Sequence, residues 1–376
     1  MQGVLLCAAL KFSLQLETGP EYDSNAARAE LLYGMARGEI GPPTGSPLWR
    51  STLSSSLTWR RGRNLLRLAG TLGGKVFFLP DVQDQDTLVG QLTIDEKFQP
   101  RPRLWLGIAL DYYDVGQLSV PSPSGTTARL RHRDFRSGSI NLTLTADIQG
   151  TRLALDGGYR GVEYKPDLQY DFHGGMAHAS IFRRFSVGDP ERPHEIDLLT
   201  SHRIERRLFF AGHAQRLACP PTTPCVGDTN STRDDWFVDT LFELTYVRAL
   251  LLALSYGLTL DLSNSFGESF LRHTVGLKAG VRLPWELYAS VKLQFLFTRF
   301  LDGLQFPPRF SEATFISLDE ENRNSLVAEL ERSVWRHDLF VKVRYSLYTN
   351  ELTSSPVDFM RHVIFVGLRY RWEIAR

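Results

Sequence analysis

The sequence predicts an all-β protein: a closed, up-and-down antiparallel β-barrel that spans a membrane with about 16 strands, within a range of about 14–18. Three observations lead to this fold class. Apolar and polar residues alternate in long runs throughout the chain, the gaps between runs are short and long in turn, and tryptophans lie near the ends of runs. The 376 residues carry 43 Lys+Arg and 42 Asp+Glu, so the net charge gives no reason to expect a nucleic-acid partner.

The stretch "WELYASVKLQFLFTRF" shows the alternation most clearly. Every second residue from Trp285 is apolar, including Leu287 and Val291, whereas Ser290 and Lys292 lie on the opposite parity. Strict alternation indicates a β-strand with one apolar and one polar face. The run is about twice as long as a usual globular strand. We therefore expect a tilted transmembrane strand whose apolar face contacts hydrocarbon and whose polar face lines the lumen.

Similar runs follow one another along the whole chain. Their predicted starts are near residues 11, 51, 63, 86, 102, 136, 151, 170, 194, 235, 251, 269, 285, 323, 339 and 359. Even-numbered runs are followed by short gaps such as "RRGR", "QPRP" and "LPW", with "VGDPERPH" the longest of this class. Odd-numbered runs are mostly followed by long gaps such as "DVGQLSVPSPSGTTARLRHR". This parity predicts short periplasmic turns, long extracellular loops, and a first strand that pairs with the last and leaves no sheet edge.

The tryptophans support the same arrangement. Four lie on the apolar parity beside a connection or the C-terminus, where they would form interface girdles: Trp59, Trp236, Trp285 and Trp372. The alternation places Trp105 and Trp335 in the lumen.

The barrel is predicted to cover residues 11–376 as a single domain. Residues 1–10, "MQGVLLCAAL", resemble the apolar part of a secretory signal and predict a trimmed remnant; a buried leading strand is the alternative. Cys219 and Cys225 bracket "CPPTTPC" and predict a small loop disulfide in an oxidising compartment. A zinc site is the alternative, with His213 as the only nearby further ligand.

The parity also assigns charged side chains to the lumen. The predicted basic cluster is Arg272, Lys278, Arg282, Lys292, Lys342, Arg344, Arg369 and Arg371. The predicted acidic residues are Asp239, Glu243, Glu329 and Glu331. A basic wall opposite an acidic wall would orient dipolar or anionic solutes, such as those bearing uronic acids or phosphates. Alternatively, neighbouring strands pair their charges, as Glu329 and Glu331 could with Lys342 and Arg344.

An enzymatic barrel is a competing hypothesis. In "GGMAHASIFRR", His178 and Ser180 are two apart on one face, as a base and a nucleophile could be, with Glu191 or Glu195 to orient the histidine. Both residues face the lumen, however, whereas a lipid-modifying site needs access to the bilayer. We therefore expect no catalytic site, and the sequence shows no nucleophile elbow and no cluster that calls for a metal or another cofactor.

The last run, "HVIFVGLRYRWEIAR", resembles the C-terminal strand of Gram-negative outer-membrane barrels. Gly367, Tyr370 and Trp372 match the Gly-x-x-aromatic-x-aromatic pattern of that strand, although four residues follow Trp372. The resemblance implies recognition of these residues by the barrel-assembly machinery and a location in the outer membrane of a Gram-negative bacterium.

The beginning of the chain carries a second resemblance. In "LETGPEYDSNAARAE", Tyr22, Asp23, Ser24 and Asn25 resemble the turn after the first strand in the β-barrel porin-2 type of outer-membrane proteins. Members of that group frequently occur with exopolysaccharide synthesis and export systems. The chain lacks the helical repeats that precede the barrel in larger polysaccharide-secreting porins.

Together these features predict a translocation channel for an exopolysaccharide or another envelope polymer. A general diffusion porin for small solutes is one alternative. A structural barrel that docks partners through the long loops near residues 19–50 and 209–234 is another. The expected partners are outer-membrane lipid and lipopolysaccharide, the barrel-assembly machinery and, for polymer export, a periplasmic or lipoprotein partner.

Overall fold

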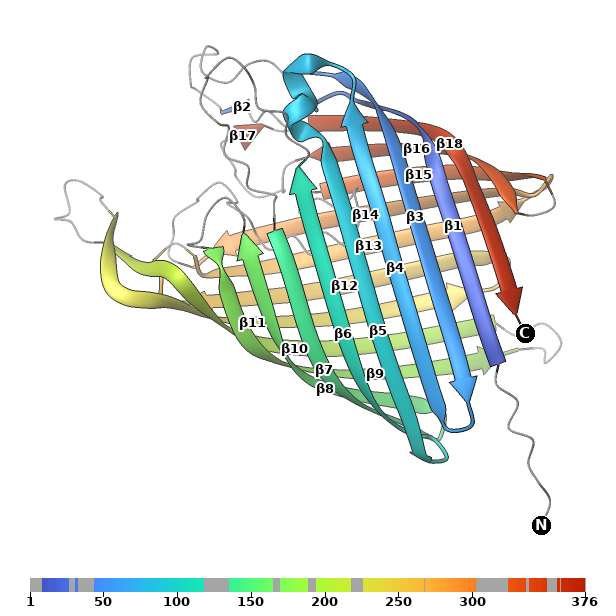
Figure 1. Ribbon diagram of the computed structural model, residues 1–376, viewed down its shortest axis with the longest axis horizontal. Coiled ribbons are helices and arrows are strands. Elements are labelled where there is room, and N and C mark those ends of the chain that lie inside the picture. The colour runs from blue at the N-terminus through green and yellow to red at the C-terminus, as the bar shows by residue number, and fades with distance from the viewer. Residues whose placement is uncertain are drawn as a thin grey trace.

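The computed structural model describes residues 9–26, 31–32, 44–117, 135–164, 170–188, 194–217, 226–266, 268–301, 324–335, 338–349, 357–358 and 360–375. Sixteen strands form one closed barrel in which neighbours along the chain pair antiparallel (Figure 1). The first strand, β1 (Ala9–Asp23), closes the barrel against the last, β18 (Met360–Ala375). The predicted fold class is confirmed.

The remaining barrel strands follow the chain in order. They are β3 (Ser46–Arg61), β4 (Asn64–Phe77), β5 (Thr87–Arg101), β6 (Leu104–Gln117), β7 (Phe135–Ile148), β8 (Thr151–Tyr164), β9 (Phe172–Val187), β10 (His194–Leu217), β11 (Val226–Val247), β12 (Leu250–Ser263), β13 (Phe270–Leu283), β14 (Leu287–Phe300), β15 (Asn324–Trp335) and β16 (Leu339–Thr349). Outside the barrel, β2 (Leu31–Leu32) pairs with β17 (Val357–Asp358), and the 3-10 helix η1 (Pro80–Gln85) lies between β4 and β5.

The two ends of the barrel differ in their connections. The end that holds both termini has the short turns, such as residues 62–63, 149–150 and 248–249 (Figure 1). The opposite end has the long connections, such as residues 24–45, 118–134 and 301–323. At the turn 149–150, Gln149 (φ 49°) and Gly150 (φ 79°) both have positive φ, as a two-residue hairpin turn requires to match the strand twist. The predicted parity of the connections is confirmed.

The outer face of the barrel is apolar. Leu142, Leu155 and Leu254 are exposed by 66%, 55% and 52%, and they belong to a large set of exposed aliphatic and aromatic residues on alternate positions of every strand. The apolar face is continuous from strand to strand, since Val291 is opposite Ala279 on β13 and Ala328 on β15. So much contiguous apolar surface is stable only in hydrocarbon, and closure pairs the backbone groups that hydrocarbon would leave unsatisfied.

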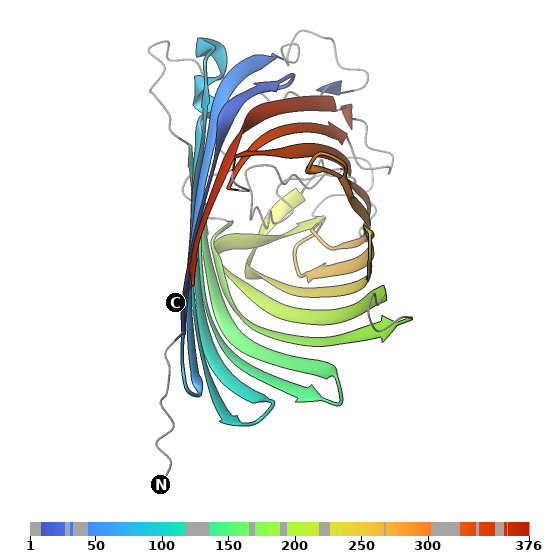
Figure 2. The same ribbon diagram turned by 90° about the vertical axis from the view of Figure 1, so that its right-hand side faces the viewer.

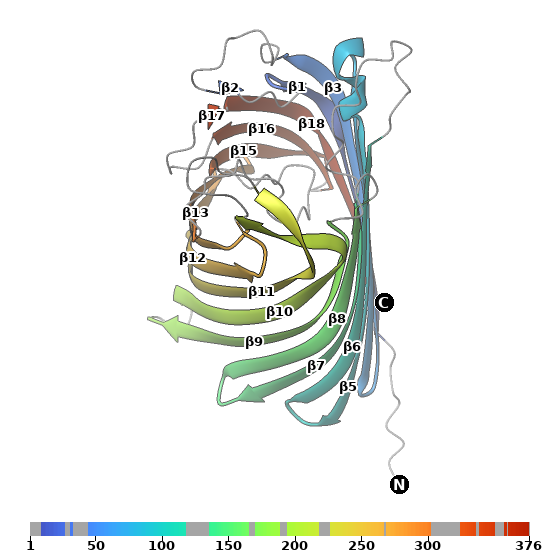
Figure 3. The same cartoon turned by 90° about the vertical axis from the view of Figure 1, so that its left-hand side faces the viewer.

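The interior is the polar side. Figures 2 and 3 show the barrel from its two sides, with all the strands curving around a common interior. An even-stranded, single-chain barrel with a lipid-facing exterior and short turns at the end of both termini is the outer-membrane class of Gram-negative bacteria. The described residues include no helix that is long and apolar enough to cross a membrane.

Several predicted boundaries are wrong. β3 begins at Ser46, and β14 begins at Leu287, so Trp285 belongs to the preceding turn, where it has φ 59° and is 80% exposed. The predicted loop 209–234 is largely strand, because β10 and β11 continue to Leu217 and from Val226. Their pairing there has register shifts, and the sequence loses its alternation because both faces of the extension leave the bilayer. Cys219 and Cys225 lie outside the described residues.

One tryptophan faces the opposite way from its prediction. A register shift between Ser333 and Trp335 pairs Trp335 with Leu339, which turns the indole outward, where it is 57% exposed. Trp105 does face the lumen, with the Arg60 guanidinium 5.9 Å from its ring centre. Trp49 also faces outward at the long-loop end. The sequence does not predict this, because the predicted start of β3 near residue 51 is too late to include it. A single bulge thus reverses the face of every residue after it.

Hydrogen bonds stabilise the closure seam between β1 and β18 at its long-loop end. Arg361 Nε donates to Asp23 Oδ1 at 2.9 Å, and the backbone N–H of His362 donates to Ser24 Oγ at 2.8 Å. Farther along the seam, a side chain on Gly367 would place its Cβ 2.5 Å from the Thr18 carbonyl oxygen. Gly367 of the predicted assembly signal therefore also has a local role, because only glycine fits this close approach. Residues 1–8 are outside the described residues, and Ala9 and Leu10 belong to β1.

Candidate functional site

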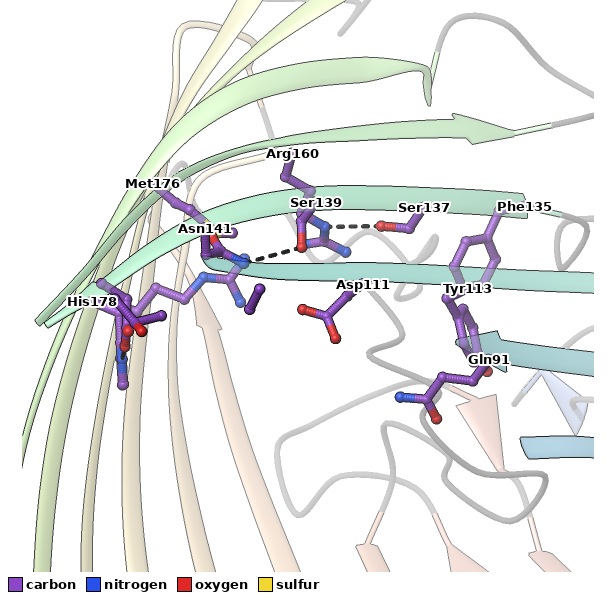
Figure 4. A pocket seen from close by; sticks show the side chains of 14 residues that line it. Gln91, Asp111, Tyr113, Phe135, Ser137, Ser139, Asn141, Arg160, Met176 and His178 are labelled. Atoms are coloured by element: carbon purple, nitrogen blue, oxygen red, sulfur yellow. Dashed lines mark hydrogen bonds and ion pairs between the residues drawn. The ribbon is translucent and has the colours of Figure 1, made fainter. Parts of the chain in front are cut away.

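A pocket of about 490 Å³ lies in the inner wall formed by β5 to β10 (Figure 4). Its lining residues are Gln91, Ala109, Asp111, Tyr113, Phe135, Ser137, Ser139, Asn141, Thr143, Asp156, Arg160, Met176, His178 and Arg203. These positions alternate with the exposed apolar residues of the same strands, so they face the lumen. Of these lining residues, the sequence pattern singles out His178 but not the pocket as a whole, because most of the side chains are uncharged.

A column of hydroxyl and amide groups crosses the pocket along β7. Ser137, Ser139, Asn141 and Thr143 are alternate residues on one face, which places successive side chains about 7 Å apart. Asn141 Nδ2 donates to Ser139 Oγ at 3.3 Å, and Arg160 Nε donates to Ser137 Oγ at 3.1 Å (Figure 4). The column therefore presents a repeated line of neutral hydrogen-bonding groups.

Aromatic and acidic groups border this column. Tyr113 and Phe135 lie side by side at one end, with ring centres 5.4 Å apart (Figure 4). Asp111 accepts a hydrogen bond of 2.8 Å from Thr93 Oγ1 beside the column. A flat ring next to neutral donors and a carboxylate is a combination that binds polyhydroxylated ligands, because the ring packs against C–H faces and the polar groups bind hydroxyls.

His178 has a carboxylate partner, but a different one from those the sequence suggested. Its Nδ1 lies 2.8 Å from Asp156 Oδ2, because the β8–β9 register places the two residues opposite each other. Glu195 instead forms an ion pair with Arg184 at 3.4 Å, and Glu191 lies outside the described residues. Ser180 is opposite Ala154 and Ser201, on the lumen parity that the sequence predicted. In the described part of the chain, no group of three or more His, Cys, Asp or Glu side chains could hold a metal ion.

A buried ionic network lines the lumen at the closure seam, and we call it the seam cluster. It consists of Glu17, Glu21, Asp23, Arg50, Lys75, Lys342, Arg344 and Arg361. At its centre, Glu21 is 2% exposed and lies 2.8 Å from Lys75 Nζ and 3.0 Å from Arg344 Nη2. The Arg50 and Arg344 guanidinium groups lie 5.8 and 5.0 Å from the Phe365 ring centre.

A second buried network lies on the far wall and is centred on Glu205. This carboxylate is 1% exposed and contacts Arg203, Arg207 and, at 3.7 Å, Arg160. Arg207 also lies 3.4 Å from Asp261 and 3.9 Å from the Phe237 ring centre. Arg160 and Arg203 belong both to this network and to the pocket, so the network fixes the cationic edge of the pocket.

The predicted basic residues all lie on the lumen parity, but they do not form one cluster. Lys342 and Arg344 belong to the seam cluster, and Arg369 pairs with Glu331. Arg272 is buried and donates to Thr298 Oγ1 at 2.8 Å. Half of the predicted cluster is therefore neutralised or enclosed.

The other four are exposed. Lys278 and Lys292 lie directly opposite each other on β13 and β14, and both are exposed to the lumen. Arg282 stacks on Tyr288, with 5.6 Å between the guanidinium carbon and the ring centre, and Arg371 is exposed near the end of β18. Across the described residues, no ion pair is found for either lysine. Like charges directly opposite repel each other, so this pair attracts an anion.

The predicted acidic residues are divided in the same way. Glu329 lies 3.0 Å from Lys342, and Glu331 pairs with Arg369 and not with Arg344. Asp239 and Glu243 accept hydrogen bonds from Thr259 at 2.7 Å and Thr245 at 3.1 Å on the β11–β12 wall. Asp239 and Glu243 are on β11, and only β12 lies between them and the lysine pair on β13 and β14, so these acidic and basic surfaces are close neighbours and not opposite sides of the bore.

Comparison with known proteins shows the porin fold. No family model matches this chain, and no curated protein is significantly similar in sequence. Salmonella typhi OmpF, solved in complex with daunomycin, superposes with a TM-score of 0.50 at 11% identity, over 96% of this chain and 97% of OmpF. Acinetobacter baumannii OccAB3 gives 0.49 at 11% identity, over 97% and 99% of the two chains. A structure described as a bacterial polysaccharide outer membrane secretin gives 0.44 at 10% identity, over 98% and 99%.

The likeness is one of fold. This chain is a barrel of the outer-membrane porin architecture, and its apolar exterior agrees with that. At 11% identity, no residue role passes from these structures to this chain.

Proposed function

We propose that the protein is a translocation channel in the outer membrane that conducts a carbohydrate polymer through its lumen, such as an exopolysaccharide or another envelope glycan. The neutral hydrogen-bonding column of β7 carries this proposal. Its hydroxyl and amide groups recur at a fixed spacing along the direction of the strand. A line of similar groups suits a ligand that itself repeats similar groups, because the ligand can advance by one unit and form equivalent contacts.

Three further points support a carbohydrate. Neutral hydrogen bonds are individually weak, which allows release as well as entry. Tyr113, Asp111 and Asp156 border the column, and these residue types bind sugar rings and hydroxyl groups. The resemblance of Tyr22–Asp23–Ser24–Asn25 to the β-barrel porin-2 type points to the same class of substrate.

The proposal is tested by current block in planar bilayers. We expect an open channel whose current is interrupted by a neutral glucan, and shorter interruptions when the column is altered by Ser139→Ala together with Asn141→Ala. Loss of two neutral hydrogen bonds predicts interruptions about tenfold shorter. The matched control is Ser255→Ala with Ser290→Ala, which removes two lumen hydroxyl groups from β12 and β14 and should leave the interruptions unchanged. A closed barrel, or equal interruptions for both double variants, would contradict the proposal.

A general diffusion porin with anion preference is the second candidate. The exposed Lys278–Lys292 pair favours it, since two neighbouring cations on the lumen wall raise the local concentration of small anions. The two candidates differ in one measurement. A diffusion porin passes small anions without interruption by the glucan, whereas the polymer channel is interrupted.

A further inference from the structure

Four tyrosine–histidine pairs lie on the lipid-facing surface of the barrel. They are Tyr159–His173, Tyr256–His273, Tyr345–His362 and Tyr246–His194. In every pair the tyrosine hydroxyl is hydrogen-bonded to Nδ1 of the histidine on the neighbouring strand, at 2.8 Å for His273 and for His362 and 2.6 Å for His194. None of these residues faces the lumen, so they have no part in the proposed channel.

The pairs lie near the two ends of the barrel. His173, His273 and His362 lie within four residues of the long-loop ends of β9, β13 and β18, and His194 is the first residue of β10 at the short-turn end. Each tyrosine lies farther from its strand end, toward the middle of the bilayer. When the tyrosine hydroxyl donates to Nδ1, the proton of a neutral imidazole is on Nε2. Each histidine therefore offers an N–H donor at the level of the lipid headgroups.

One of the four pairs has a cation beside it for which the described part of the chain provides no carboxylate partner. In the β13–β14 register, Leu271 is opposite Arg299 and His273 is opposite Phe297, so Arg299 and His273 are diagonal neighbours on the same outward face. Such neighbours are about 7–8 Å apart at Cα, within reach of one shared ligand. Arg299 is exposed, and no ion pair is found for it in the described residues.

The His173 pair provides an internal comparison. Arg206 is a diagonal neighbour of His173, because His173 is opposite Leu208 on β10, and it lies on the short-turn side of the histidine, whereas Arg299 lies on the long-loop side of His273. Both ends of its guanidinium are held by Asp234, with Nε 3.2 Å from Oδ1 and Nη2 2.7 Å from Oδ2. Arg206 is thus already neutralised, whereas the described residues supply no such partner to Arg299.

We propose that Arg299 and His273 bind the phosphate group of an outer-leaflet glycolipid, with Tyr256 orienting the histidine. Arg299 supplies a forked cation and His273 a second donor, which together match a phosphate at the interface. Phe297, Phe295 and Val275 continue the same face toward the middle of the bilayer, where they contact acyl chains. Because the site is at the long-loop end, it faces the outer leaflet. The phosphorylated lipid of that leaflet carries both the negative charge that Arg299 would bind and the acyl chains that the apolar face would contact.

The test measures the lipid that stays bound to the purified full-length barrel. Native mass spectrometry with added diphosphoryl lipid A should show one retained lipid, and His273→Gln with Arg299→Gln should weaken this binding about tenfold. Arg206→Gln is the control, because it removes an outward arginine that Asp234 already holds beside another tyrosine–histidine pair, and it should leave the binding unchanged. A gel-shift assay of heat-modifiable folding shows that each variant forms the barrel.

A second arm uses the unaltered protein, so that a folding failure of the double variant cannot decide the result. Fully dephosphorylated lipid A should bind at least tenfold more weakly than the diphosphoryl form. Equal binding of the two lipids, or equal binding by the double variant and the Arg206→Gln control, would overturn the proposal. Displacement of the lipid by millimolar inorganic phosphate would assign the site to a free anion and not to a lipid. The outcome is independent of what the lumen conducts.

Discussion

Two parts of the inner wall use the same residue types in opposite ways. At the closure seam, Lys75 and Arg344 are buried against Glu21, so these charges are enclosed in the wall and not exposed to the lumen. On the β13–β14 wall, Lys278 and Lys292 are opposite each other and exposed, and no described carboxylate forms an ion pair with either. The seam cluster joins strands from both ends of the chain and holds the barrel closed, whereas the lysine pair is positioned to attract solutes. Lumen charge in this barrel is therefore of two kinds, structural and solute-facing.

The largest effect that tests this distinction is expected at the seam. Glu21→Gln removes the charge shared by Arg50, Lys75 and Arg344, and leaves three buried cations with less compensation. Removal of one partner of a buried ionic network costs about 3–5 kcal/mol. The free energy of unfolding, measured by urea titration in lipid vesicles, should fall by that amount.

The matched control for Glu21 is Glu329→Gln. Glu329 also contacts Lys342, but its side chain is 33% exposed, and Lys342 keeps Glu17 as a partner. The expected loss is below about 1 kcal/mol. Similar losses for the two variants would mean that the seam cluster has no special structural role.

The next largest effect contrasts the two faces of β14. Val291→Lys places a charge on the lipid face, one residue from the natural Lys292 on the lumen face. A lysine at the bilayer midplane destabilises a transmembrane barrel by about 2–4 kcal/mol. We expect poor assembly of this variant in vesicles, visible as loss of heat-modifiable migration on gels. Lys292→Gln should assemble as the unaltered protein does, and the reverse pair of results would show that the two faces are assigned wrongly.

The sequence was sufficient for the fold because a membrane barrel has a period of two in every strand and a strict parity of connections. Those two regularities place Val291 outside and Lys292 inside without any knowledge of tertiary contacts. Exceptions arise where a local event breaks the period, as the bulge before Trp335 does. Outside the bilayer the period vanishes altogether, which is why the sequence pattern predicts a loop where β11 extends from Val226.

The candidate site was harder to predict because it depends on register between strands. Glu17, Glu21 and Asp23 lie on the lumen parity of β1, and closure of the first strand against the last was expected, so their proximity to Arg344 and Arg361 was within reach of the sequence. Glu21 also contacts Lys75 on β4, which is separated from β1 by β3. This contact forms because the two long side chains meet over β3, and strand pairing alone does not predict it. The pairing of His178 with Asp156 likewise follows from a register that alternation alone does not fix.

The smallest stability effect, and the most direct test of the solute-facing wall, is expected from the lysine pair itself. Lys278→Gln together with Lys292→Gln removes a repulsion between directly opposite like charges, so the barrel should become more stable by about 0.2–1 kcal/mol. The same change should lower the anion preference of the channel, measured as a shift of the reversal potential toward zero in a KCl gradient. Lys278→Arg with Lys292→Arg keeps the charge and should keep the potential. An unchanged reversal potential in the glutamine variant would mean that these lysines, although exposed, do not line the path of the ions. The barrel would then have structural charge at the seam but no solute-facing charge at the lysine pair.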